Sequence, residues 1–319
     1  MERGPGTYED RVLGQASMPQ LRGNAAILAS MRRALPAFAL LLAAGCYGAV
    51  PGPREATSIG TTSSGILAHG VALPERGPGF VRARPGEETR WGTPGLVGAL
   101  QRAFASVART FPGSVPARVG DLSAPGGGRH TRHRSHRTGR DVDVIFYLTD
   151  PDGRATTPRG WLAFGRYGHA IEESSGDLFF FDDARNWHFV RTLLLDPEAD
   201  VQWIFVSRGL KTRLLEYALA HETSAEALVR AAYVVQQPER AAPHDDHFHV
   251  RVFCSAHDRA SGCRDVGPRW PWLRPDVEAI AGRDGAGLDD ASLLAALLDG
   301  DDPAAGGDAP RARPLVSTR

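Results

Sequence analysis

The sequence lacks a net charge, a long apolar run and a large set of cysteines. Its 37 lysine and arginine residues balance 37 aspartate and glutamate residues, so no excess positive charge indicates binding to nucleic acid or to an acidic membrane surface. The apolar run near the N-terminus, residues 34–44, is too short to cross a bilayer. Only 3 cysteines occur among 319 residues. This odd number leaves at least one of them outside any disulfide within the chain.

Residues 31–46, MRRALPAFALLLAAGC, have the order of a bacterial export signal. Two arginines precede a short apolar segment that ends in small residues before Cys46. This ending resembles a lipobox, which precedes a lipid-modified cysteine, whereas the alternative is an ordinary signal peptide cleaved after a small residue. Both predict export. The lipobox further predicts a membrane anchor at Cys46 and a place in the periplasm at the outer membrane, with residues 1–30 as an upstream extension.

Cys254 and Cys263 form a close pair in a chain that is predicted to enter an oxidising compartment. We therefore expect a disulfide that closes this short loop and restricts the unfolded chain. A nucleophilic Cys254 would need a free thiol and an activating base, and the nearby Cys263 argues against both.

Composition divides the rest of the chain. Proline and glycine mark residues 47–57 as a linker, residues 58–274 are predicted to fold, and residues 275–319 are expected to be an acidic, disordered tail with one short helix at 289–298. Helices and strands mix without a regular βαβ order, which predicts an α+β fold with a small, mostly antiparallel central sheet flanked by helices. Apolar spacing and β-formers predict helices at 96–111, 187–195, 210–220 and 225–235 and strands at 141–147 and 201–206.

The segment HDDHFHVRV, residues 244–252, places three histidines and two aspartates beside an apolar strand. On that strand His247 and His249 face the same side, and Phe248 faces the other. Two imidazoles on one face can bind a transition metal, although an H-x-H pair alone also fits two surface or core histidines. A metal site needs a further ligand from elsewhere in the chain.

A second histidine-rich segment, GGGRHTRHRSHRTGRDVDV at 126–144, offers that ligand. Asp141 and Asp143 begin the predicted strand and share one of its faces. His136 precedes Asp143 in the spacing H-x6-D. Together with His249 this pair gives three ligands and leaves the fourth position open, which is the pattern of catalytic rather than structural zinc sites.

The H-x6-D and H-x-H motifs are those of the lysostaphin, D-Ala-D-Ala peptidase and hedgehog group of zinc peptidases. Within that group the chain resembles the penicillin-insensitive murein endopeptidase family over about residues 58–272. Five separated segments carry the resemblance in the same order: SIGTTSSGILAHGVALP (58–74), GDLSAPGGG (120–128), SHRTGRDVD (135–143), RNW (185–187) and HDDHFHVRVFC (244–254).

The resemblance implies one Zn²⁺ per chain, held by His136, Asp143 and His249. It implies that His247 faces the attacking water and that His133 and His244 are further active-site histidines. The implied substrate is peptidoglycan, cleaved at the bond from D-alanine to the side-chain amine of diaminopimelate. A neighbouring imidazole can take a proton from water and pass it to the leaving amine.

Three neighbours of these motifs have open roles. Asp141 either orients a ligand histidine or is an ordinary carboxylate at a strand edge. Arg137 and Arg140 belong to an arginine-rich run that either holds substrate carboxylates or forms a solvated face. His130 has no counterpart in the motifs and is expected to be an ordinary loop residue.

Two rival functions remain at this stage. One is a zinc D,D-carboxypeptidase or dipeptidase of the same group, which would release free D-alanine instead of splitting cross-links. The other is a zinc-containing module that binds the cell wall without cutting it. The presence of His247 beside the ligand set argues against the module, because a protein with no reaction to catalyse has little need for a base.

Overall fold

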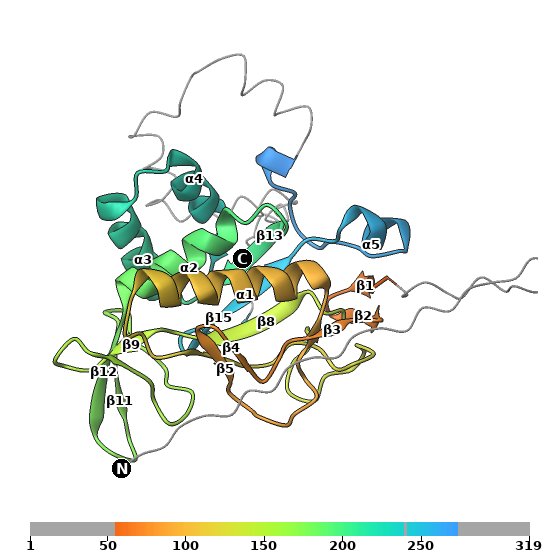
Figure 1. The fold of residues 1–319 in the computed structure, drawn as a ribbon. Helices are drawn as coiled ribbons and strands as arrows, with labels where there is room; N and C mark the ends of the chain where they lie inside the picture. The colour runs from red at the N-terminus through yellow and green to blue at the C-terminus, as the bar shows by residue number, and fades with distance from the viewer. Residues whose placement is uncertain (1–54, 239–240, 274–319) are drawn as a thin grey trace, which may run out of the picture. The chain divides into compact units, whose positions relative to one another are not determined.

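The computed structural model describes residues 55–238 and 241–273. This part of the chain contains helices and strands mixed along the sequence, which confirms the predicted α+β class (Figure 1). The export signal, Cys46, most of the linker and the predicted tail at 275–319 with its helix at 289–298 lie outside the described residues. Where the chain is described, none of the helices combines the length and the apolar composition that a membrane crossing requires.

The main sheet has seven strands in the order β14-β13-β15-β8-β7-β5-β4. Its neighbours pair antiparallel except for two parallel pairs, β13 with β14 and β5 with β7, so the mostly antiparallel sheet is confirmed. The strands are β4 (Arg76–Gly77), β5 (Phe80–Arg82), β7 (Ala117–Val119), β8 (Asp141–Ile145), β13 (Val201–Phe205), β14 (Val235–Gln236) and β15 (His247–Val252).

The described residues form three further, smaller sheets. The sequence predicts no element for most of these strands, because they are only two to five residues long and lack a clear apolar alternation. They are β1 (Thr57–Thr61) with β2 (Ser64–Ala68), β3 (Val71–Ala72) with β6 (Trp91–Gly92), and a four-stranded sheet of β9 (Leu148–Thr149), β10 (Ala155–Thr156), β11 (His169–Glu172) and β12 (Asp177–Phe181).

The four predicted helices are present as α1 (Pro94–Thr110), α2 (Asp183–Leu194), α3 (Arg208–His221) and α4 (Ala225–Val234). A short helix, α5 (Ala256–Ala260), and a 3-10 turn, η1 (Pro271–Leu273), follow. Helix α1 begins where Thr93 caps it by accepting a hydrogen bond from the backbone of Leu96, with Pro94 in the first turn.

Two side chains near the start of α2 explain why α2 starts earlier and β8 ends earlier than the sequence predicts. Asp182 caps α2 by accepting a bond from the backbone of Arg185 at 3.0 Å, which adds polar residues to the helix start. The buried Asn186 side chain then bonds both backbone groups of Tyr147, at 2.9 and 2.8 Å. Tyr147 therefore pairs with a side chain instead of continuing the β8 ladder.

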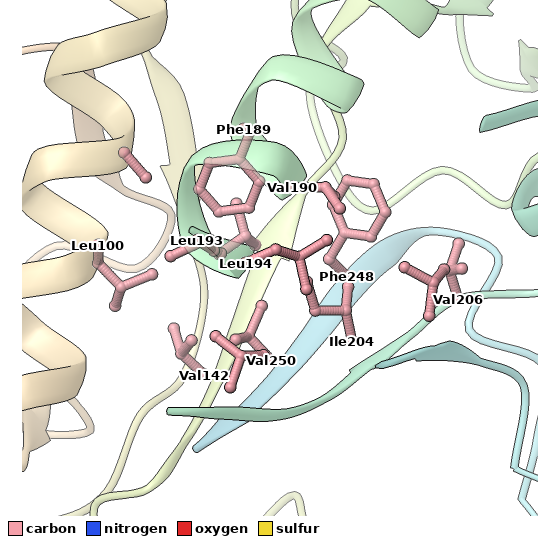
Figure 2. Close-up of a cluster of buried hydrophobic side chains, with 14 of the residues drawn as sticks. Leu100, Val142, Phe189, Val190, Leu193, Leu194, Ile204, Val206, Phe248 and Val250 are labelled. Carbon is pink, nitrogen blue, oxygen red and sulfur yellow. The ribbon is translucent and has the colours of Figure 1, made fainter. Parts of the chain in front are cut away.

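The core lies between the helices and one face of the main sheet (Figure 2). Figure 1 shows α1 and α2 lying across that face. In Figure 2 side chains of α2 and Leu100 of α1 point toward the apolar side chains of three neighbouring strands: Val142 of β8, Ile204 of β13, and Phe248 and Val250 of β15. Leu100 and these four strand residues are fully buried.

Cys254 and Cys263 are joined by a disulfide just after β15. Helix α5 lies inside the closed loop, and Gly60 of β1 bridges to Cys263. The bond therefore holds the exit of the strand that carries the H-x-H motif against β1.

Candidate metal centre

The face of β8 and β15 that lies away from the helices is polar. The two strands pair antiparallel with His249 directly opposite Asp143 and Arg251 opposite Asp141. Because alternate residues face the same side, His247 and His249 share a face with both carboxylates. The residues between them, such as Phe248, enter the core on the helical side.

The three ligands implied by the resemblance converge on one carboxylate. Oδ1 of Asp143 lies 3.3 Å from Nε2 of His136 and 3.2 Å from Nδ1 of His249. The rings of the two histidines are 4.8 Å apart between centroids. All three residues are buried. Residues far apart in the sequence thus present two imidazole nitrogens and one carboxylate to a common point.

The backbone of the loop before β8 fixes His136. Its φ of 61° lies in the left-handed region, which few residues other than glycine adopt. Its backbone N–H donates to Oδ2 of Asp141 at 3.0 Å, and its ring Nδ1 donates to the carbonyl of Leu122 at 3.1 Å. Since Nδ1 carries the proton in this bond, Nε2 presents its lone pair to Asp143.

The unsatisfied atoms of this cluster test whether it fits a metal. Nε2 of His136 and both carboxylate oxygens of Asp143 are buried without a hydrogen-bond partner. Buried polar atoms are rarely left in this state, and a cation between them would satisfy all three. Two imidazoles and one carboxylate are a donor set for a divalent transition metal. The residues present therefore fit a metal ion.

His247 stands next to this cluster with its ring orientation fixed. Nδ1 bonds the carboxylate of Asp246, so Nε2 faces the centre, 3.4 Å from Oδ1 of Asp143. Burial alone would lower the pKa of His247, but the charges of Asp143 and Asp246 raise that pKa to about 10. A divalent cation at Asp143 would offset the first of these charges.

Asp121 was not singled out by the sequence analysis, and it binds His133. It is fully buried, and its Oδ2 lies 3.0 Å from Nε2 of His133, which is also 3.4 Å from Oδ2 of Asp143. Burial would raise the pKa of Asp121, but hydrogen bonds from His133 and from the fork of Arg132 hold it well below its ordinary value. The only sequence signal for Asp121 is its place in GDLSAPGGG, one of the segments that carry the family resemblance.

Two more histidines complete the cluster. His244 lies 5.4 Å from His247 and 5.7 Å from His249 between ring centroids, and its pKa is lowered to about 4 by burial and by those two rings. His130, expected as an ordinary loop residue, is instead buried with its ring 4.7 Å from that of His133. Burial, with help from neighbouring histidines, lowers its pKa to about 4 as well. Both rings are therefore neutral at ordinary pH.

Asp141 contacts two of the expected ligands. Its Oδ1 accepts a hydrogen bond from Nε2 of His249 at 3.1 Å, while its Oδ2 holds the backbone of His136. Arg251 pairs with it at 2.6 Å. Burial would raise the pKa of Asp141, but Arg251 and His249 keep it well below its ordinary value. This geometry favours orientation of the ligands over a plain strand-edge carboxylate.

The expectation that Arg140 binds substrate is wrong. Its side chain is 1% exposed, and all three guanidinium nitrogens are bonded inside the protein, among them to the carbonyl of Val252 at 3.1 Å and to Asp265 at 2.8 Å. It ties the residues that follow the disulfide, Arg264 and Asp265, to the end of β15. Arg137 is half-buried beside His136, and its contact with substrate stays a prediction.

Comparison with known proteins identifies the family of the chain. The family model of penicillin-insensitive murein endopeptidases matches residues 58–269. The chain is 28% identical to the Haemophilus influenzae penicillin-insensitive murein endopeptidase, over 67% of this chain and 68% of that one. It is 29% identical to the Klebsiella pneumoniae protein of that name (73% and 81%) and 30% identical to one from Escherichia coli (65% and 69%). The chain belongs to the penicillin-insensitive murein endopeptidase family.

Proposed function

We propose that the protein is a zinc-dependent endopeptidase that hydrolyses the D-alanyl–diaminopimelate cross-links of peptidoglycan. One observation carries the proposal. The buried, unpartnered donor atoms of His136 and Asp143 converge with His249 beside an oriented His247. The family supports the substrate, since its curated relatives are named murein endopeptidases.

The chain's own residues supply the proton transfers. Zinc, when bound by His136, Asp143 and His249, supplies the Lewis acidity that polarises a scissile carbonyl and makes water acidic. Nε2 of His247 accepts the proton of the attacking water and then protonates the leaving amine. The carboxylate of Asp246 holds Nδ1 of His247 throughout, so the same ring nitrogen performs both steps.

His133 and His247 approach different oxygens of Asp143, at 3.4 Å each. They can therefore act on different atoms of one substrate. Asp121 accepts a bond from Nε2 of His133, and its negative charge stabilises that ring as a donor. Because this same Nε2 also faces the centre, the part-exposed His133 can share its N–H between Asp121 and the developing oxyanion.

The decisive experiment uses the full chain with its metal counted. Cross-linked muropeptide dimers are incubated with the protein, with and without a chelator, and the products are resolved by mass. We expect dimers to become monomers and the chelator to stop the reaction. His136→Ala should lose both zinc and activity; an active His136→Ala enzyme would refute the ligand assignment.

The same products separate the two rival functions. Release of free D-alanine without loss of dimer would assign the protein to the D,D-carboxypeptidases. One bound zinc with no product at all would make it a wall-binding module.

We also propose that the protein is exported and anchored by a lipid at Cys46. The segment MRRALPAFALLLAAGC supports this, and action on the cell wall requires export. Labelled palmitate should enter the protein in cells and fail to enter Cys46→Ala. Unlabelled protein in the periplasm would instead indicate an ordinary signal peptide.

A further inference from the structure

Two arginines beside the metal centre, Arg84 and Arg118, have too few carboxylates near them to balance their positive charges. Nη1 of Arg84 lies 3.3 Å from Oδ2 of Asp121, but the same carboxylate already receives the fork of Arg132, at 2.8 Å for both bonds. Arg118 donates to the carbonyl of Pro158 at 2.7 Å and, within the described part of the chain, has no ion pair. The group formed by Arg84 and Arg118 is therefore positively charged.

The positive charge of Arg84 acts on Arg118. Burial first, and then the charge of Arg84, lower the pKa of Arg118. Both side chains are only partly buried, so they remain open to a ligand. Two like charges held together at a partly buried site are unfavourable unless an anion binds between them.

Trp161 connects these arginines to the reacting groups. Its ring lies 5.2 Å from Cζ of Arg84 and meets the ring of His247 edge-on at 5.1 Å. The indole of Trp161 can take this position because residue 120, which lies against the ring, is a glycine. A Cβ at Gly120 would lie 2.6 Å from a ring carbon of Trp161. Arg84 and the indole thus form one wall beside His247, and the bond of Arg118 to Pro158 ties this second arginine to the loop that carries Trp161.

The chemistry of the proposed substrate matches this wall. In the cross-link, the carbon that bears the scissile nitrogen also carries a free carboxylate, on the diaminopimelate side. His247 must reach that nitrogen to protonate it, so the carboxylate arrives next to His247. Planar guanidinium groups bind carboxylates through paired hydrogen bonds, and an indole shields such a pair from water.

We propose that Arg84, Arg118 and Trp161 form the subsite that binds the carboxylate of the leaving diaminopimelate. The inference rests on the proposed function, and it makes specificity depend on the acid beside the scissile amide. A substrate in which that carboxylate is amidated loses the paired hydrogen bonds, leaves Arg118 without a counter-ion and leaves Arg84 with only its share of Asp121.

The test compares two muropeptide dimers, one with the diaminopimelate carboxylate free and one with it amidated. For the wild-type protein we expect KM to be about tenfold higher for the amide, which corresponds to one charge-assisted bond. Arg118→Gln should bring the two KM values together, and Arg118→Lys should restore part of the preference. Arg118 suits this test because its hydrogen bond goes to the carbonyl of Pro158 and not to Asp121 or the histidines, whereas Arg84→Gln, the second variant, also loses a contact to Asp121.

Arg109→Gln is the matched control, because Arg109 is an exposed arginine at the end of α1. The Arg109→Gln variant should keep the wild-type preference for the free-acid dimer over the amidated dimer. An unchanged preference in both Arg118→Gln and Arg84→Gln, or a wild-type protein that does not discriminate, would overturn the subsite.

A binding measurement separates failure of the subsite from failure of the function. Calorimetry with the uncross-linked diaminopimelate peptide needs no turnover. We expect about tenfold tighter binding of the free acid than of the amide, lost in Arg118→Gln. If neither dimer is cut but this difference holds, the proposed function is wrong and the subsite stands. If the acid and the amide bind equally, the subsite is wrong whatever the activity.

Discussion

The two faces of β8 and β15 differ in chemistry, although residues adjacent in the sequence form them: one face is apolar and the other is polar. On the helical face, Phe248 and Val250 are fully buried among apolar side chains. On the other face, His247 and His249 meet Asp143 with several buried polar atoms unsatisfied. Apolar burial stabilises the fold, whereas unsatisfied polar groups cost free energy that a bound cation can recover.

This difference explains how the metal centre keeps a fixed geometry without contributing to the free energy of unfolding itself. Its carboxylates and imidazoles are fixed by a sheet whose free energy of unfolding comes from the opposite face. Substitutions on the two faces should therefore separate cleanly. Changes on the polar face should lower turnover or metal affinity, and changes on the apolar face should lower the free energy of unfolding.

The largest effect is expected for His247→Ala. Loss of the base should lower kcat by about 10²–10⁴-fold, because proton transfer is worth that much in a hydrolytic reaction. The metal content should stay at one per chain, and the free energy of unfolding should change by less than about 1 kcal/mol. Kinetics with muropeptide dimers, metal analysis and urea unfolding measure the three quantities. Loss of metal in this variant would mean that His247 is a ligand.

The next effect concerns the neighbouring residue on the other face. Phe248→Ala should lower the free energy of unfolding by about 3–5 kcal/mol, the usual cost of removing a fully buried ring. That ring packs edge-on against Phe146 at 4.8 Å and near Phe181 and Phe189, each at 6.2 Å. Urea unfolding of the metal-loaded protein gives the value. A loss below about 1 kcal/mol would show that the helical face contributes less than its burial suggests.

Local patterns could predict much of this arrangement. Apolar spacing located helices α1 to α4, and strand alternation placed His247 and His249 on one face and Phe248 on the other. Alternation does not account for the error at Arg140. The residue directly precedes β8, and it is buried because its guanidinium group meets partners far away in the sequence: Ser58, Val252, Arg264 and Asp265.

The rest of the site depends on contacts that no local pattern encodes. Asp121 bonds Thr89 and His133, which lie 32 and 12 residues away in the chain. Trp161 comes from a loop between short strands and reaches His247 across the fold. Such side chains have no periodicity, because their positions follow from loop paths that the tertiary structure sets.

The smallest effect is expected for Asp141, which contacts a proposed metal ligand but is not itself a ligand. Asp141→Asn should lower metal affinity by about 10–100-fold, since the carboxylate that fixes Nε2 of His249 loses its charge. Competition with a chelator measures this affinity. Asp265→Asn is the matched control: it also removes the charge that faces an arginine, at 2.8 Å from Arg140, but its carboxylate contacts Arg140 and the backbone of Cys254 and not the histidines. Its metal affinity should change by less than about twofold. Equal losses in both variants would mean that Asp141 acts only through the stability of the sheet. A loss confined to Asp141→Asn would show that the polar face orients its own ligands, independently of the apolar face behind it.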